Sequence, residues 1–137
     1  MDQSLLAQLA DFFKAQRGDI ACVYLFGSRA RGDFGNKSDL DIAVLFEQTP
    51  PETLNGLGLD LASELEEVVK MPVDLVVLNR ASPDLVHRIL RDGVLVYEAN
   101  RSARVKFEVR ARAEYFDVLP YLREYRCHRT DPSRDRS

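Results

Sequence analysis

The sequence predicts an α/β (α+β) fold in which helices pack on a small mixed β-sheet. Short runs rich in β-branched and aromatic residues alternate with segments whose apolar residues recur at helical spacing. Such alternation favours helices layered on a sheet. The 137 residues suffice for one domain with its own core, and the chain shows no repeat and no second domain.

The first third of the chain predicts one long helix and two strands. A helix is expected over residues 4 to about 16, which begin with a serine able to cap it. Residues 20–26 are typical of a buried strand. A short helix is expected over residues 28–31, and two glycines and an asparagine indicate a loop over residues 32–38. Residues 40–46 form the next predicted strand.

The middle of the chain alternates helix and strand twice more. A helix is expected over residues 52–69, followed by a strand over residues 73–78. Ser82 can cap a third long helix, with a proline at its first position, and Gly93 stops it. Residues 94–97 form a short fourth strand.

A long final helix is expected from residue 100 to about residue 125, with a kink or break at Pro120. The polar residues 130–137 are expected to be disordered. We expect residues 1–100 to form the main body, and residues 101–137 to add a helical extension and a polar tail to the same domain. Some apolar residues of this extension can cover the sheet, and others are left over for a partner protein.

Charge is divided unevenly along the chain. Residues 1–100 hold 9 basic and 16 acidic side chains, and residues 101–137 hold 10 and 6, which together give the net charge of −3. An acidic body argues against duplex DNA as a partner. The basic extension could meet an acidic protein surface or RNA, or it could be a solvated helix face.

Cysteine usage and hydropathy indicate a cytoplasmic protein. No apolar run approaches the roughly 20 residues of a membrane-spanning helix. The N-terminal residues include acidic side chains and no basic segment of the kind that opens a signal peptide. Cys22 is expected to be a buried free thiol in a core strand, far from Cys127, and a reducing compartment suits this arrangement.

The chemistry is concentrated in one short motif. Gly27 and Ser28 follow a predicted strand, and after ten residues Asp39-Leu40-Asp41 opens the next strand. Side chains alternate along a strand, so Asp39 and Asp41 share one face and Leu40 points to the other. Two neighbouring carboxylates repel each other, and a bound Mg²⁺ resolves the conflict. The Gly-Ser turn would supply the phosphate side of such a site.

This pattern resembles the signature of the nucleotidyltransferase superfamily that includes DNA polymerase beta. The likeness covers residues 1–100 by motif order, with Asp74 on a later strand in the place of the third carboxylate. It is closest to minimal nucleotidyltransferases of the MntA type, antitoxins paired with HEPN-domain toxins. The resemblance implies that the strands of the motif neighbour each other, with the Asp74 strand beside them.

The resemblance also implies roles for the residues. Gly27 and Ser28 would bind the triphosphate of ATP, and Asp39 and Asp41 would hold two Mg²⁺ ions. Asp74 would complete the second metal and take the proton from the attacking hydroxyl. An ion pair with a nearby lysine or arginine is the alternative for Asp74.

Other polar residues flank the motif. They are Arg29, Arg31, Lys37 and Ser38. Positive side chains would favour the leaving pyrophosphate, although the basic ones could equally be solvated loop residues. Ser38 is the strongest candidate, because it directly precedes the aspartate pair. His87 and His128 have no partner at ligand spacing and are expected to be boundary or surface residues.

The resemblance implies an antitoxin enzyme that transfers AMP to a hydroxyl, expected to be a tyrosine, of a HEPN ribonuclease. Such an enzyme would form a hetero-oligomer with its toxin. Two alternatives remain open. One is transfer to a small molecule such as an aminoglycoside, although the chain has no separate acceptor domain. The other is an antitoxin that only binds its toxin, although all three carboxylates of the family are present.

Overall fold

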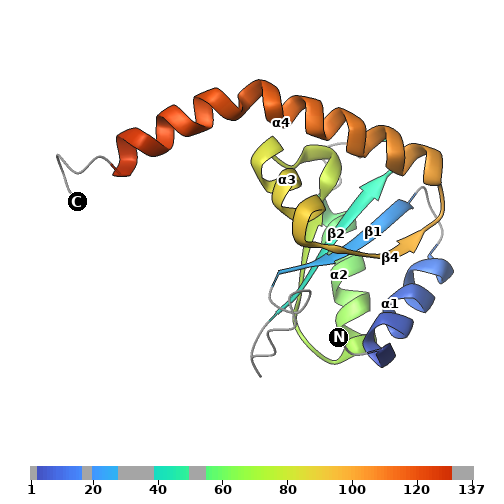
Figure 1. Ribbon diagram of the computed structural model, residues 1–137. Coiled ribbons are helices and arrows are strands. Elements are labelled where there is room, and N and C mark those ends of the chain that lie inside the picture. The colour runs from blue at the N-terminus through green and yellow to red at the C-terminus, as the bar shows by residue number, and fades with distance from the viewer. Residues whose placement is uncertain (1–2, 17–19, 28–38, 50–54, 131–137) are drawn as a thin grey trace.

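A four-stranded sheet lies between two pairs of helices in the computed structural model (Figure 1). The structure describes residues 3–16, 20–27, 39–49 and 55–130. For residues 55–59 and 122–130 it describes the backbone but not the side chains. The elements are α1 (Gln3–Ala15), β1 (Ile20–Phe26), β2 (Leu40–Phe46), α2 (Asn55–Val69), β3 (Val73–Val77), the 3-10 turn η2 (Leu78–Arg80), α3 (Pro83–Asp92), β4 (Val94–Glu98) and α4 (Arg101–Thr130). The predicted α/β class is confirmed.

The sheet has the order β3-β2-β1-β4 and is mixed. β1 pairs antiparallel with β2 and with β4, whereas β2 and β3 run parallel. The expected arrangement is therefore confirmed: the two strands of the motif are neighbours, and the Asp74 strand lies beside them. This leaves β3 and β4 as the edge strands.

Two apolar cores cover the two faces of the sheet. The first joins α1 and α2 to the sheet, and its most buried members include Leu9, Phe13, Leu25, Ile42 and Leu65. The second joins α3 and the start of α4 to the opposite face, through Tyr24, Ala43, Ile89, Phe107 and Ala111. Strand residues alternate between the two cores, as the pleat of a sheet requires, except at the register shift near the start of β1.

Several predicted bounds hold and some need correction. The caps predicted at Ser82 and Asn100 are confirmed, because Ser82 Oγ accepts a hydrogen bond from the Leu85 amide and Asn100 Oδ1 accepts one from the Ala103 amide. The predicted cap at Ser4 is wrong, since α1 begins at Gln3 and Ser4 lies inside the helix. β3 ends one residue earlier than predicted, where η2 begins. The helix α4 continues through Pro120 to Thr130, so the predicted break and the earlier end are wrong.

Other predictions cannot be compared with the structure. The short helix at 28–31, the loop at 32–38, the start of the helix at 52–54 and the tail at 131–137 lie outside the described residues. Within the described part of the chain, no helix combines the length and the apolar character needed to cross a membrane.

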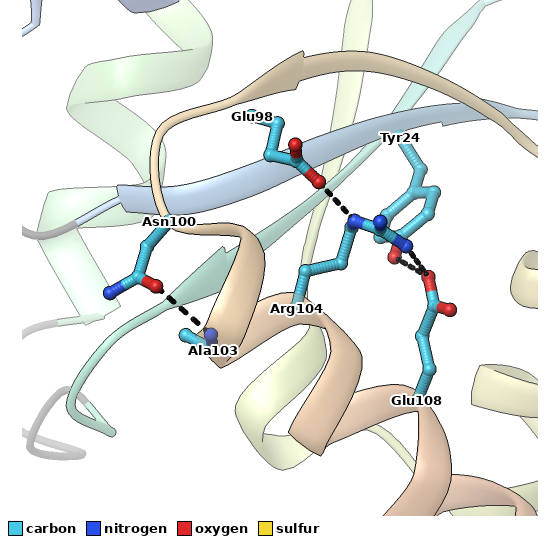
Figure 2. A network of polar contacts seen from close by, with 6 residues as sticks. All are labelled: Tyr24, Glu98, Asn100, Ala103, Arg104 and Glu108. Carbon is cyan, nitrogen blue, oxygen red and sulfur yellow. Dashed lines mark hydrogen bonds and ion pairs between the residues drawn. The ribbon is translucent and has the colours of Figure 1, made fainter.

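A polar network fastens the first turns of α4 to the sheet (Figure 2). Arg104 donates hydrogen bonds to Glu98 on β4 and to Glu108 one turn further along α4. The Tyr24 hydroxyl on β1 donates to the same Glu108 carboxylate at 2.6 Å. These hydrogen bonds raise the pKa of Arg104 and keep it charged. The later turns of α4 extend well beyond the sheet (Figure 1).

Candidate active site

Strand pairing brings the predicted site residues to one end of the sheet. β1 ends where β2 begins, and Phe26 is the register partner of Asp41. Asp41 is in turn the register partner of Asp74 on the parallel strand β3. Adjacent strands lie about 4.8 Å apart, so the backbones of the two aspartates are direct neighbours.

The aspartates also share one face of the sheet. Leu40 and Ile42 are fully buried in the core beneath α1 and α2, so Asp39 and Asp41 alternate to the opposite face. Val73 packs on that same core, which turns Asp74 to the face of Asp41. Asp39 and Asp74 are exposed and Asp41 is half-buried, so all three can be reached by a ligand.

Gly27 makes room for the carboxylate of Asp41. Its φ is +79°, in the left-handed region that favours glycine. A Cβ atom built on Gly27 would lie 2.1 Å from Asp41 Oδ2. From the sequence, Gly27 was expected to let a phosphate approach the backbone closely. The structure shows a second reason for glycine here, because a side chain at this position would collide with the carboxylate of Asp41.

Two hydrogen bonds position the strand ends that carry the aspartates. The Leu40 amide donates to the Pro72 carbonyl at 2.9 Å, which ties the start of β2 to the start of β3. The Val73 amide donates to Glu66 Oε2 on α2, also at 2.9 Å. Sequence reasoning missed Glu66, because its contact depends on how α2 turns into β3. That turn passes through Lys70, whose φ is +60°.

The three aspartates match Mg²⁺ in donor chemistry, since Mg²⁺ prefers carboxylate and phosphate oxygens. Their carboxylates do not form a closed cluster. Across residues 3–16, 20–27, 39–49 and 55–130, no three acidic, histidine or cysteine side chains are gathered as a metal site. The neighbouring strand positions and the exposure of the side chains suit the ion, and the metal-binding role of these residues stays a prediction.

The remaining site residues of the motif cannot be placed. Ser28, Arg29, Arg31, Lys37 and Ser38 all lie outside the described residues. Their predicted contacts with phosphate therefore stay predictions.

His87 and Cys22 have the environments expected for them from the sequence. The ring of His87 stacks on Tyr115 with centroids 3.7 Å apart, as befits a boundary histidine. Cys22 is a buried free thiol, as predicted, and burial raises its pKa to about 11. The side chains of His128 and Cys127 are outside the described part.

Curated relatives share part of the chain. The protein adenylyltransferase MntA of Aphanizomenon flos-aquae is 32% identical over 93 residues, which are 63% of this chain and 62% of that protein. The protein of the same name from Shewanella oneidensis is 38% identical over 72 residues, or 52% of this chain and 49% of its own length. The chain thus spans between about half and three fifths of these relatives.

Solved structures share the fold over most of the chain. A toxin–antitoxin crystal structure with AMP-PNP aligns with a TM-score of 0.76 at 25% identity, covering 88% of this chain and 94% of the other. The complex of a tri-AMPylated Shewanella oneidensis HEPN toxin with MNT antitoxin aligns at 0.72 and 24% identity, covering 91% and 95%. The second likeness shows the fold alone.

A family model extends over most of the body. The model described as polymerase beta, nucleotidyltransferase matches residues 7–102, which include every element from β1 to β4 and all three aspartates. This range also contains the Gly-Ser pair and the Asp-Leu-Asp segment in the spacing described above. The chain therefore belongs to the polymerase beta nucleotidyltransferase family.

Proposed function

We propose that this protein is an antitoxin enzyme, which transfers AMP from ATP to a hydroxyl of a HEPN ribonuclease toxin and so neutralises it. The observation that carries the proposal is the pairing of Asp41 with Asp74 at the exposed end of two parallel strands, beside Gly27. Family membership supports nucleotidyl transfer as the chemistry. The names of the two adenylyltransferase relatives, and the nucleotide analogue in the similar toxin–antitoxin structure, support AMP transfer in particular.

The nucleotide would be held by the segment between β1 and β2. Gly27 and Ser28 bind the triphosphate, because a residue without a side chain lets the backbone approach and a hydroxyl can donate to an oxygen. Ser38, Arg29 and Lys37 lie in the same segment of sequence and favour the negative charge of the leaving pyrophosphate.

Asp39, Asp41 and Asp74 are the residues that would hold Mg²⁺, with two ions expected. When bound, these ions supply charge neutralisation at the phosphates and a lower pKa for the attacking hydroxyl. The protein's own contribution is to fix the carboxylates. Strand pairing holds Asp41 against Asp74, and Glu66 holds the start of β3.

The reaction is an in-line displacement at the α-phosphorus of ATP. The acceptor oxygen forms a bond to this phosphorus, the bond to the oxygen that bridges the α- and β-phosphates breaks, and pyrophosphate leaves. The acceptor proton passes to the carboxylate of Asp74. This residue is exposed on the edge strand β3, where a large acceptor can approach from outside the sheet. A tyrosine on the toxin, which reaches far from its backbone, is the proposed acceptor.

We propose that the enzyme works in the cytoplasm. The buried free thiol of Cys22 supports this location, because a reducing compartment keeps such thiols unpaired.

The test combines the purified chain, Mg²⁺, its cognate HEPN toxin and each of the four NTPs labelled at the α-phosphate. Label should pass from ATP to the toxin, and mass spectrometry should place AMP on a tyrosine. The double variant Asp39→Asn/Asp41→Asn should remain folded and lose transfer. Asp11→Asn, an exposed aspartate of α1, is the matched control and should transfer AMP as the wild type does.

Three results would contradict the proposal. Transfer by the double variant would show that the paired aspartates are not the catalytic ligands. Tight toxin binding without any transfer by the wild type would favour an antitoxin that acts by covering its toxin. Labelling of an aminoglycoside in place of the toxin would favour the small-molecule alternative.

A further inference from the structure

We infer that the outward face of α4 is a docking surface for an amphipathic helix with acidic flanks on the partner protein. This inference rests on the proposed function, since the partner is taken to be the toxin. The surface is called the outer stripe and consists of Val105, Val109, Ala113, Phe116 and Pro120.

The outer stripe lies opposite the face of α4 that packs on the body. Its residues are spaced three or four apart, so they line up along one side of the helix. Phe107 and Ala111, which are buried in the core, fall on the opposite side at 3.6 residues per turn. Val109 is 58% exposed and Phe116 is 64% exposed. The core of the protein covers only one of the two apolar sides of α4, so the other side is available to a partner.

A cavity beside the outer stripe offers a place for an anchoring side chain. It has a volume of about 220 Å³ and lies between α3 and α4. Leu90, Ala111, Tyr115 and Phe116 contribute apolar wall. The remaining lining residues are polar: His87, Arg91 and Arg112. Large apolar side chains in such pockets dominate the energy of many interfaces. Phe116 therefore belongs both to the outer stripe and to the pocket.

The charged residues beside the outer stripe indicate which kind of partner helix would bind there. Basic residues outnumber acidic ones among the exposed residues beside the outer stripe. Lys106 and Arg110 lie on one side, followed by the acidic Asp117, and Arg101 and Arg112 lie on the other. The acidic Glu108 is engaged by Tyr24 and Arg104. A second copy of this chain would bring like charges together along both flanks, which is unfavourable. A partner helix with acidic flanks forms ion pairs instead.

The direction of α4 brings this surface toward the aspartates. Glu108 contacts Tyr24 in the middle of β1. Two turns further along α4, Tyr115 stacks on a residue of α3. α3 ends at Gly93, where an added Cβ would lie 3.2 Å from the Leu25 carbonyl, two residues before Gly27. The helix then extends beyond the body (Figure 1). A partner held on the outer stripe is thus kept near the site end of the sheet.

The test measures toxin binding by calorimetry for the full chain and for Phe116→Glu, Val109→Glu and Arg112→Glu. Phe116→Glu should weaken binding by about 30-fold or more, as loss of a central aromatic anchor does. Val68→Glu is the matched control. Val68 lies on α2 and is 43% exposed, compared with 58% for Val109 on the outer stripe. Binding should also weaken as salt is raised, and less steeply for Arg112→Glu.

The outcomes separate this inference from the proposed function. Wild-type AMP transfer with full toxin binding by both folded stripe variants would overturn the docking surface and leave the activity intact. An equal loss with Val68→Glu would also overturn it. Dimerisation of the chain alone in sedimentation, abolished by Val109→Glu, would assign the outer stripe to a second copy. Absence of wild-type transfer would count against the proposed function.

Discussion

Replacing Gly27 with alanine separates the demands of the fold from those of the site. The left-handed backbone costs alanine about 1 kcal/mol more than glycine, a small part of the 5–15 kcal/mol typical of a domain. The protein should therefore stay folded. The new Cβ, however, would lie 2.1 Å from Asp41 Oδ2, whereas ordinary contacts are about 3.5 Å. The carboxylate must move by about 1.4 Å, and a misplacement of about 1 Å can already cost about 100-fold in rate.

The assay compares AMP transfer to the toxin with urea unfolding for Gly27→Ala and Gly93→Ala. Gly93 is the control because its added Cβ would also be crowded, at 2.5 Å, but against the Ile89 carbonyl of α3. Gly93→Ala should lose stability and keep most of its transfer rate while folded. A folded Gly27→Ala protein with the wild-type rate would refute the reasoning, because the position of Asp41 would then be irrelevant to catalysis.

Three further predictions concern stability. Glu66→Ala should lower the free energy of unfolding in urea by about 1–3 kcal/mol relative to Glu67→Ala, because the Val73 amide loses its acceptor. Burial raises the pKa of Cys22 from 9.0 to about 11, so the folded state holds its proton more tightly. Stability should therefore fall by roughly 2–3 kcal/mol as pH rises from 9 to 11, and Cys22→Ala should flatten this part of the pH profile. Lys70→Gly should raise the free energy of unfolding by about 1 kcal/mol, since glycine accepts the positive φ at this position; an unchanged melting temperature would contradict this.

Local patterns predicted the inner strands to the residue. β1 and β2 span residues 20–26 and 40–46, as expected, because each is an apolar run bounded by polar residues or glycine. The strand order rested on family resemblance, since pairing joins distant segments that no local pattern encodes. η2 was missed for the same reason. It is held by Asn79, whose side chain bonds both the amide and the carbonyl of Phe46 at the end of β2.

The end of α4 shows the limit of a local rule. Proline removes one backbone donor, and a kink or break at Pro120 was predicted on that ground; the helix continues without a break. The helix already has more than four turns before Pro120, and its first turns are fastened by Arg104, Tyr24 and Phe107. Once a helix is nucleated, one missing hydrogen bond need not end it.

The sequence predicted which residues form the candidate site, but not the contacts that hold them in position. Asp39, Asp41 and Asp74 follow from the motif and from the alternation of strands. The contact of Gly27 with Asp41 and that of Glu66 with Val73 join residues from different elements. Each depends on register or on the exit angle of a helix. Such contacts are identified in the structure, by finding the hydrogen-bond partner of each backbone amide and the neighbours of each carboxylate.

The division of charge links the site to the docking surface. The body is acidic, with 16 acidic and 9 basic side chains in residues 1–100, and its site aspartates lie at an exposed end of the sheet. Both ATP and an acidic partner are repelled by such a surface over the range of the Debye length. The basic flanks of the outer stripe offset this repulsion for the partner. Reversing these flanks with Lys106→Glu/Arg110→Glu should therefore slow toxin association more than dissociation, as charge steering requires.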